Sequence, residues 1–294
     1  MKKKSMLGPL LLVVTALIWG TAFVFQRSGM DHIGPFSFGA FRYGVSALCL
    51  WPFARKHRHK EIPLSKDPTV KWGLLCGFFL FAGGTMQQMG LVHTTAGKAG
   101  FITALYIVLV PLFSGLVLKK HVSLQSWFCV VMATVGFYLL SIRDGFSIEL
   151  GDFIVFIGVF FWVGHILVID KGVDDMEPMV LSMTQMVVAS VLSFILALIF
   201  EEISLVALKG ALVAILYTGI FSGAVAFTMQ MYGQRYTEPT IASLLMSLES
   251  VFAVAAGYLF LNEVLTAREA LGAIVIFIAV ILAQIPLGKK EKTL

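Results

Sequence analysis

Residues 6–25 read MLGPLLLVVTALIWGTAFVF, an apolar run without a charged side chain. A helix of about 20 apolar residues matches the thickness of the hydrocarbon core of a bilayer, so this run predicts a membrane-spanning helix. The basic start of the chain, MKKK, resembles that of a signal peptide, but no small-x-small cleavage pattern ends the run. We therefore expect a first spanning helix that is retained.

The composition of the whole chain is that of an integral membrane protein. Of 294 residues, 58% are hydrophobic and 13% charged, and the mean hydropathy is +0.89, whereas about a quarter of the residues of a soluble domain are charged. The net charge is +5, but the basic residues form short clusters between apolar blocks, so no nucleic-acid partner is expected. The three cysteines lie far apart inside apolar blocks and predict neither disulfides nor a metal site, and no cofactor is expected.

Nine further apolar blocks follow the first. The ten blocks cover residues 7–27, 36–54, 72–92, 97–118, 124–142, 152–170, 179–200, 210–233, 239–261 and 267–287. Because lipid cannot pair backbone polar groups, only helices or closed barrels cross a membrane, and these blocks are too long for barrel strands. The sequence predicts an all-α integral membrane protein with ten transmembrane helices.

The chain also contains an internal repeat. A shift of 143 residues without gaps superposes pairs of uncommon residues: Trp19 on Trp162, Gly29 on Gly172, Asp31 on Asp174, Pro35 on Pro178, Gln87 on Gln230, Gly90 on Gly233 and Thr94 on Thr237. These pairs predict a duplication of five helices, with the first repeat in residues 1–145 and the second in residues 146–294. An odd number of helices per repeat means that the second copy enters the membrane from the opposite side, so the two repeats are inverted.

The basic residues of the connections predict the orientation. Most of the 22 Lys and Arg residues fall on the side of the two termini, including the cluster in residues 55–71. The other side holds Arg27, Lys98, Arg143, Lys209 and Arg268. By the positive-inside rule, both termini are expected in the cytoplasm and the chain in the plasma membrane.

Several short motifs together resemble the drug/metabolite transporter superfamily, in particular its EamA-like ten-helix members. The motifs are Trp19-Gly20-Thr21, Pro35, Phe41-Arg42-Tyr43, the stretch TTAGKAGFIT at residues 94–103, SLESVF at residues 247–252, and Leu261-Asn262-Glu263. The resemblance covers nearly the whole chain. It implies a bundle of two inverted five-helix repeats around a central cavity that exports or exchanges amino acids, drugs or related metabolites.

The two halves differ at some positions of these motifs. The second half has Val163 in place of Gly20 and Gln185 in place of Arg42, and the first half has Lys119-Lys120 in place of Asn262-Glu263. We therefore do not expect the two halves to contribute identical residues to a site.

Two charged residues lie deep within the predicted helices, where a charge is costly and often functional. Glu249 is near the middle of the ninth helix. It is either a proton-carrying or cation-binding carboxyl, since an apolar setting favours the protonated form, or a buried structural carboxyl. Arg42 is about two turns into the second helix. It is either a clamp for a substrate carboxylate or a side chain that reaches outward or bonds backbone carbonyls, and the sequence favours the second role.

Uncharged side chains at similar depth complete the predicted cavity. The candidates are Trp19, Gln87, Tyr106, Trp162, His165, Gln230, Ser243 and Ser247. His165 shares a helix face with Trp162 and is a candidate proton relay for Glu249 or an interhelical hydrogen-bond partner. The equivalent residues Gln87 and Gln230 fit gates at opposite ends of a pathway, and interhelical hydrogen bonding explains them as well.

Other local patterns are structural. The pairs Gly73 and Gly77, and Gly219 and Gly223, have the spacing of close helix–helix contacts. A kink is expected at Pro111, and Pro239 is expected to open a helix.

These features favour a secondary transporter that moves a small metabolite, amino acid or drug-like compound by alternating access, with proton coupling as one mode. No catalytic residues are indicated, and no phosphate-binding loop for ATP is present in the sequence. The alternatives are a nucleotide-sugar or lipid-carrier translocator, for which more deep basic residues are expected, and a membrane-embedded enzyme or scaffold. The sequence does not fix the oligomeric state.

Overall fold

The computed structural model describes residues 6–57, 67–94, 96–117, 119, 121–141, 149–172, 177–261 and 266–285. Within these ranges the protein is helical, without a strand. The helices are α1 (Leu7–Met30), α2 (Pro35–His57), α3 (Pro68–His93), α4 (Ala96–Ala104), α5 (Tyr106–Val117), α6 (Leu124–Ser141), α7 (Leu150–Gly172), α8 (Pro178–Phe200), α9 (Leu205–Gly210), α10 (Leu212–Tyr217), the π-helix η2 (Thr218–Ala226), α11 (Phe227–Tyr236), α12 (Pro239–Met246), α13 (Glu249–Leu261) and α14 (Ala267–Gln284).

The ten predicted spans correspond to α1, α2, α3, α4–α5, α6, α7, α8, α10–η2–α11, α12–α13 and α14. In the described chain, eight stretches are long and apolar enough to cross a membrane. The apolar core of α6, Leu124–Leu140, is shorter, and α2 is more polar because it holds Arg42 and ends in a basic turn. The predicted all-helical membrane fold is confirmed.

Two of the spans are broken, which the sequence did not predict. The fourth span is interrupted at Leu105, whose N–H bonds Ile102 O at 3.1 Å and whose carbonyl accepts from Val108 N at 3.0 Å. The interruption does not fall at Pro111, where the sequence predicts a kink. Pro111 lies inside α5, where its missing N–H removes one bond near the start of the helix without ending it.

The ninth span is interrupted at the equivalent place. The break between α12 and α13 falls at Ser247 and Leu248, and Leu248 is 143 residues after Leu105. Tyr106 and Glu249, which are also equivalent, are the first residues of the half-helices α5 and α13. Pro239 opens α12, as expected.

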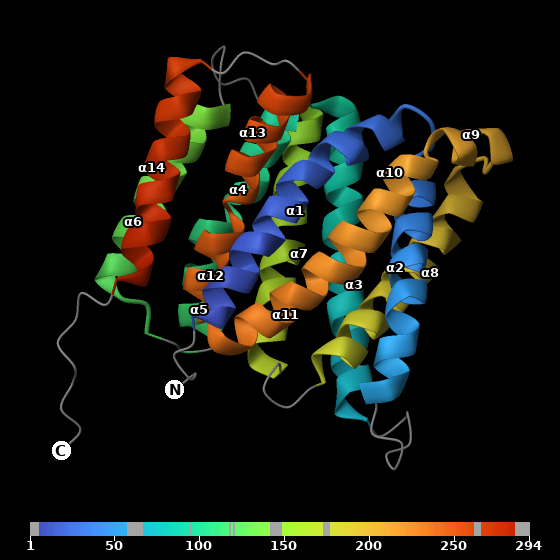
Figure 1. Cartoon of the computed structure of the whole chain (residues 1–294), viewed down its shortest axis with the longest axis horizontal. Helices are drawn as coiled ribbons and strands as arrows, with labels where there is room; N and C mark the ends of the chain where they lie inside the picture. Colours follow the sequence, from blue (N-terminus) through green and yellow to red (C-terminus); the bar gives the residue numbers. More distant parts are fainter. Residues whose placement is uncertain are drawn as a thin grey trace.

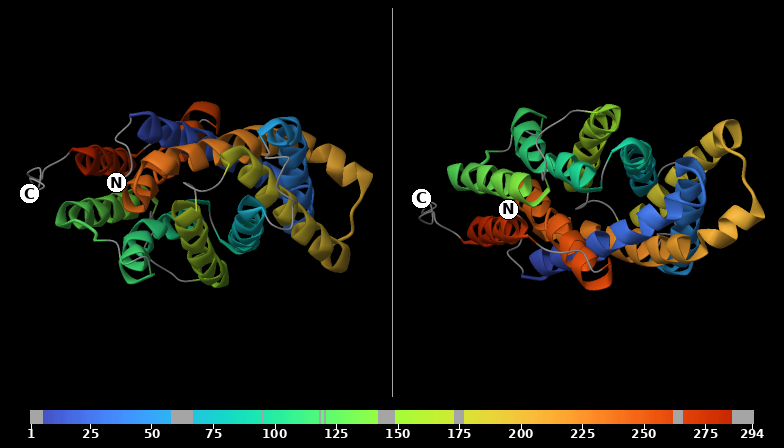
Figure 2. Two further views of the ribbon diagram at one scale, coloured as in Figure 1. Left: turned by 90° about the horizontal axis from the view of Figure 1, so that it is seen from below. Right: turned by 90° about the horizontal axis from the view of Figure 1, so that it is seen from above.

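The packing follows the same equivalence. α3 packs against α7 and α8, and the corresponding span α10–η2–α11 packs against α1 and α2. The glycine pairs lie at these contacts, since Gly77 faces Val188 of α8 and Gly223 faces Ser46 of α2. Seen from both ends, the helices form an elongated arrangement of two rows, with α6 and α14 at one extreme and α2, α8 and α9 at the other (Figure 2).

The α2–α8 contact is closed by a carboxylate. Glu201 directly follows α8 and accepts hydrogen bonds from Phe36 N at 2.9 Å and Ser37 N at 2.8 Å. These N–H groups belong to the first turn of α2 and have no partner inside the helix. The negative charge of the carboxylate also interacts favourably with the positive end of the helix dipole. The second half of the chain therefore caps a helix of the first.

α1 begins and α14 ends at the same end of the bundle, which is also where α2 ends (Figure 1). We call it the termini end. The cytoplasmic location of this end remains a prediction, and the basic residues Arg58, Lys60 and Lys66 lie outside the described residues, as do Lys120, residues 142–148, Asn262 and Glu263.

Candidate functional site

A cavity lies at the centre of the bundle between the two halves of the chain. The empty space between its atoms is about 690 Å³, which includes its open mouth. It is lined by Trp19, Phe23, Gln26, Arg42, Tyr43, Gln87, Thr103, Tyr106, Trp162, Ile166, Thr218, Ser222, Gly223, Phe227, Gln230, Met246 and Glu249. Seven of the candidates from the sequence are among them: Trp19, Arg42, Gln87, Tyr106, Trp162, Gln230 and Glu249.

The helix breaks bring two of these residues to the cavity. Tyr106 and Glu249 start half-helices, and both side chains are over 90% buried. Glu249 forms no hydrogen bond or ion pair with any described residue. Its position in the first turn of α13 places the carboxyl at the positive end of the helix dipole, which offsets part of the cost of a charge there.

Arg42 points into the cavity and not outward, contrary to the role that the sequence favoured. Its side chain is 7% exposed. Nη1 donates to Gln26 Oε1 at 2.9 Å and Nη2 to Tyr43 Oη at 2.7 Å, and the guanidinium carbon lies 4.5 Å from the centre of the Tyr43 ring. A buried charge needs such partners, and they orient the guanidinium toward the cavity that Glu249 also lines.

An aromatic wall forms one side of the cavity. The ring of Phe227 lies between the equivalent residues Trp19, at 4.8 Å between ring centres, and Trp162, at 6.5 Å and nearly parallel. Trp19 Nε1 also donates to Ser222 O in the π-helix at 3.2 Å. This wall suits an apolar or aromatic portion of a solute.

Gln87 and Gln230, the two candidate gates, both line this cavity and bond to different residues. Gln87 Nε2 donates to Thr103 Oγ1 at 3.2 Å, and Gln230 Nε2 donates to Gln234 Oε1 at 2.9 Å. Both side chains therefore join helices or helix turns at the cavity wall.

Four buried polar atoms of the lining have no hydrogen-bond partner among the described residues. They are Arg42 Nε, Tyr106 Oη, Trp162 Nε1 and Gln230 Oε1. Buried polar groups are nearly always paired, so this set of donors and acceptors is suited to bind a polar solute.

Three candidates from the sequence do not line the cavity. Ser243 and Ser247 are fully buried and donate to carbonyls of their own helix, Thr240 O at 2.9 Å and Leu244 O at 2.8 Å. His165 is also fully buried and bonds Gln185 Oε1 at 2.8 Å behind the cavity wall.

Sequence reasoning missed several lining residues. Phe23 and Gln26 follow Trp19 by four and seven positions, the spacing of one helix face, so the face of Trp19 could have revealed them. Tyr43 and Phe227 carry no such signal, because aromatic residues are common throughout the apolar blocks.

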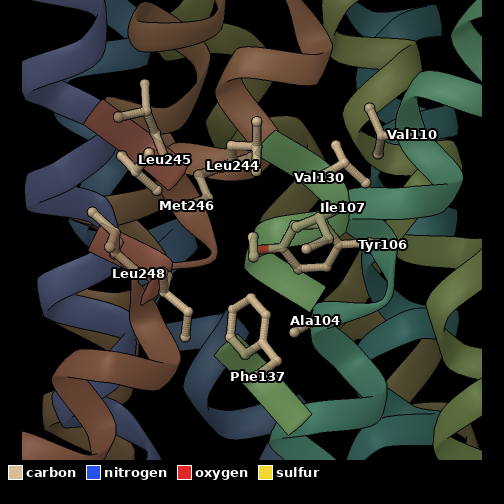
Figure 3. Packing of buried hydrophobic residues seen from close by; sticks show 14 of the residues in the cluster. Ala104, Tyr106, Ile107, Val110, Val130, Phe137, Leu244, Leu245, Met246 and Leu248 are labelled. Carbon is tan, nitrogen blue, oxygen red and sulfur yellow. The ribbon is translucent and has the colours of Figure 1, made fainter. Parts of the chain in front are cut away.

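The cavity is closed toward the termini end. There α5 packs against α12. Ile107 and Val110 of α5 and Leu244 and Leu245 of α12 are at most 1% exposed and belong to one buried cluster, in which Figure 3 labels them. The equivalent helices toward the opposite end are α13 and α4, which make few contacts in the described chain. We call the α5–α12 contact the inner seal.

Among the residues described, no group of three or more His, Cys, Asp or Glu side chains is placed to hold a metal ion.

The sequence matches the model of a known protein family. The model of the EamA-like transporter family matches residues 6–142 and, a second time, residues 149–284. This chain belongs to the EamA-like transporter family. The family fits the drug/metabolite transporter resemblance seen in the sequence.

Individual relatives agree with this assignment. A protein named uncharacterized transporter from Archaeoglobus fulgidus is 32% identical over 96% of this chain and 87% of its own length. The uncharacterized inner membrane transporter YedA of Escherichia coli K12 is 26% identical over 93% of this chain and 88% of its own. A WAT1-related chloroplastic protein of Arabidopsis thaliana is 26% identical over 94% of this chain and 69% of its own.

A solved crystal structure has the same fold, with a TM-score of 0.80 at 16% identity, over 96% of this chain and 97% of that one. The protein is a multi-pass membrane transporter.

Proposed function

We propose that this EamA-family protein is a secondary transporter that binds a small amphipathic solute in the central cavity and releases it on the other side by alternating access. The observation that carries the proposal is the asymmetry between two equivalent contacts. The inner seal between α5 and α12 is closely packed, whereas the equivalent helices α13 and α4 make few contacts in the described chain. In a protein built from two inverted repeats, each repeat can adopt the arrangement that the other has here. The cavity then opens to the opposite side of the membrane.

The inverted relation of the halves is part of this proposal. It is supported by the equivalent breaks at Leu105 and Leu248 and by the corresponding packing of the two halves. Broken helices at mid-depth are typical of transporters of this kind, because the ends of half-helices bind solutes and ions.

The lining indicates the class of solute. Its two charged residues are Arg42 and Glu249, and the aromatic wall lies in the same cavity. We infer a small solute with a carboxylate, an apolar or aromatic body and a cationic or neutral polar group. A phosphate-bearing nucleotide sugar or lipid carrier would be expected to meet more than the single cationic side chain of this lining.

Glu249 is our candidate for proton coupling. A carboxyl without an ion-pair partner can alternate between protonated and ionised forms during a transport cycle, at less cost than a permanent charge. The charged and titratable groups that share its cavity are Arg42, Tyr43 and Tyr106. His165, proposed from the sequence as the relay, lies behind Trp162 in this structure.

The test combines a thermal-shift screen with flux. L-phenylalanine, 3-phenylpropionate and phenethylamine share an aromatic body and differ in charge, so their effects on the unfolding temperature in detergent rank the charge preference. The compound that stabilises most is then loaded as a radiolabel into proteoliposomes. We expect flux above protein-free liposomes that saturates with concentration. Binding without any flux would contradict the transporter proposal.

A further inference from the structure

A second polar pair lies directly behind the wall of the cavity. His165 of α7 and Gln185 of α8 are fully buried and joined by a hydrogen bond of 2.8 Å from His165 Nε2 to Gln185 Oε1. The imidazole meets the rings of Trp162 and Phe227 edge-on, at 6.1 and 5.7 Å between ring centres. Both rings line the cavity, so a single layer of side chains separates the pair from it.

The pair is incompletely bonded. Because an amide oxygen only accepts hydrogen bonds, His165 Nε2 carries the proton, and Nδ1 of the neutral ring is an acceptor. His165 Nδ1 and the donor Gln185 Nε2 have no partner among the described residues. Buried donors and acceptors are nearly always paired and costly to leave unpaired, so this pair calls for a functional explanation.

The position of Gln185 in the repeat suggests an explanation. Gln185 is the repeat equivalent of Arg42, 143 residues later. Each reaches the first helix of its own half: Arg42 bonds Gln26 on α1, and Gln185 bonds His165 on α7. The Arg42 pair lines the cavity, which the inner seal closes toward the termini end, whereas the Gln185 pair is covered.

We propose that Gln185 and His165 form a second solute-binding site, which is uncovered when the cavity opens toward the termini end. This inference rests on the proposed alternating access. When the two halves exchange arrangements, Gln185 takes the place relative to the cavity that Arg42 holds here. The site presents a neutral donor and a neutral acceptor, so it suits a group that both accepts and donates, such as a hydroxyl or an amide. A solute that enters from the end opposite the termini thus meets the cation of Arg42. A solute that enters from the termini end meets the uncharged groups of Gln185 and His165.

Accessibility of single cysteines tests this without a known solute. Cys49, Cys76 and Cys129 are replaced by alanine, and Gln185→Cys, Gln26→Cys, Leu244→Cys and Ala189→Cys are each introduced alone. A membrane-impermeant methanethiosulfonate reagent is added to oriented proteoliposomes from either side. Ala189 is one turn from Gln185 on the same helix and equally buried, so it reports local opening of α8. Leu244 reports opening of the inner seal.

We expect Gln185→Cys and Leu244→Cys to react from the termini end, Gln26→Cys to react at least tenfold faster from the opposite end, and Ala189→Cys to react from neither. If Leu244→Cys reacts and Gln185→Cys does not, the second site is wrong while alternating access stands. If neither reacts from the termini end, both proposals are wrong. Equal reaction at 185 and 189 reveals general loosening of α8 and also overturns the second site.

Discussion

Two neighbouring side chains hold the guanidinium of Arg42 in the cavity. Gln26 and Tyr43 each bind one end of the guanidinium, which leaves Nε as a donor without a partner among the described residues. The planar fork of arginine matches a carboxylate in a way that the point charge of lysine does not.

Replacement of Arg42 by lysine should therefore weaken the binding of a carboxylate solute. We expect Kd to rise about tenfold, since the loss of a charge-assisted hydrogen bond costs about 1.5 kcal/mol. The quench of tryptophan fluorescence measures Kd, because Trp19 and Trp162 line the cavity. Arg27→Lys is the control, since Arg27 bonds only Leu91 O at 3.4 Å in the described chain and does not line the cavity. An unchanged Kd in Arg42→Lys would show that the guanidinium does not contact the solute.

Glu249→Gln keeps the shape of the side chain and removes its titration. The variant should still exchange solute across the membrane. It should lose the accumulation that an imposed pH gradient drives, because only an ionisable group can couple proton movement to solute movement. Uptake into proteoliposomes with and without the gradient measures this. Glu177→Gln, which changes a carboxylate at the start of α8 outside the cavity, is the control. Full gradient-driven accumulation in Glu249→Gln would assign Glu249 a structural or solute-binding role.

The half-helices determine which side chains reach the cavity. Because α5 and α13 both begin at the cavity, the breaks turn one residue from each half toward it. The sequence predicted the ten spans and the pairing of Tyr106 with Glu249, since length, hydropathy and the 143-residue shift carry that information. It did not predict the breaks, because Leu105 and Leu248 are good helix formers and neither break contains Gly or Pro. Tertiary packing determines them.

The sequence placed Arg42 less well for a related reason. Whether a long basic side chain turns inward or outward depends on partners from other helices, and Gln26 could be identified as that partner only once α1 and α2 were positioned. Ser243 and Ser247 show the opposite case: a buried hydroxyl pairs within its own helix as readily as it faces a cavity.

Helix contacts at glycine should determine stability. A methyl group at Gly77 would approach Gln185 O and the Val188 side chain, so Gly77→Ala should lower the free energy of unfolding by about 1–3 kcal/mol. A methyl group at Gly100 meets no atom within 4 Å, so Gly100→Ala should leave stability unchanged or raise it by up to about 1 kcal/mol. Thermal unfolding in detergent compares the two. An equal shift in both variants would rule out the close α3–α8 contact as the cause.

For the complete fold, the distribution of basic residues predicts the orientation in the membrane. We expect cysteines placed at position 60 and at position 147 to be modified from opposite sides, the first only after a reagent enters the cell and the second in intact cells. Labelling of intact cells with an impermeant maleimide, with a cysteine-free chain as the control, measures this. Ready modification at position 60 and none at position 147 would reverse the assigned orientation.

The central claim is that the inner seal opens during transport. Spin labels at Val117, at the exposed end of α5, and at Glu238, before the first turn of α12, report the width of the seal by pulsed electron paramagnetic resonance in proteoliposomes. Our account predicts two distance populations, with the ratio between them shifted by a transported solute. A single short distance, identical with and without solute in protein that transports it, would contradict the account.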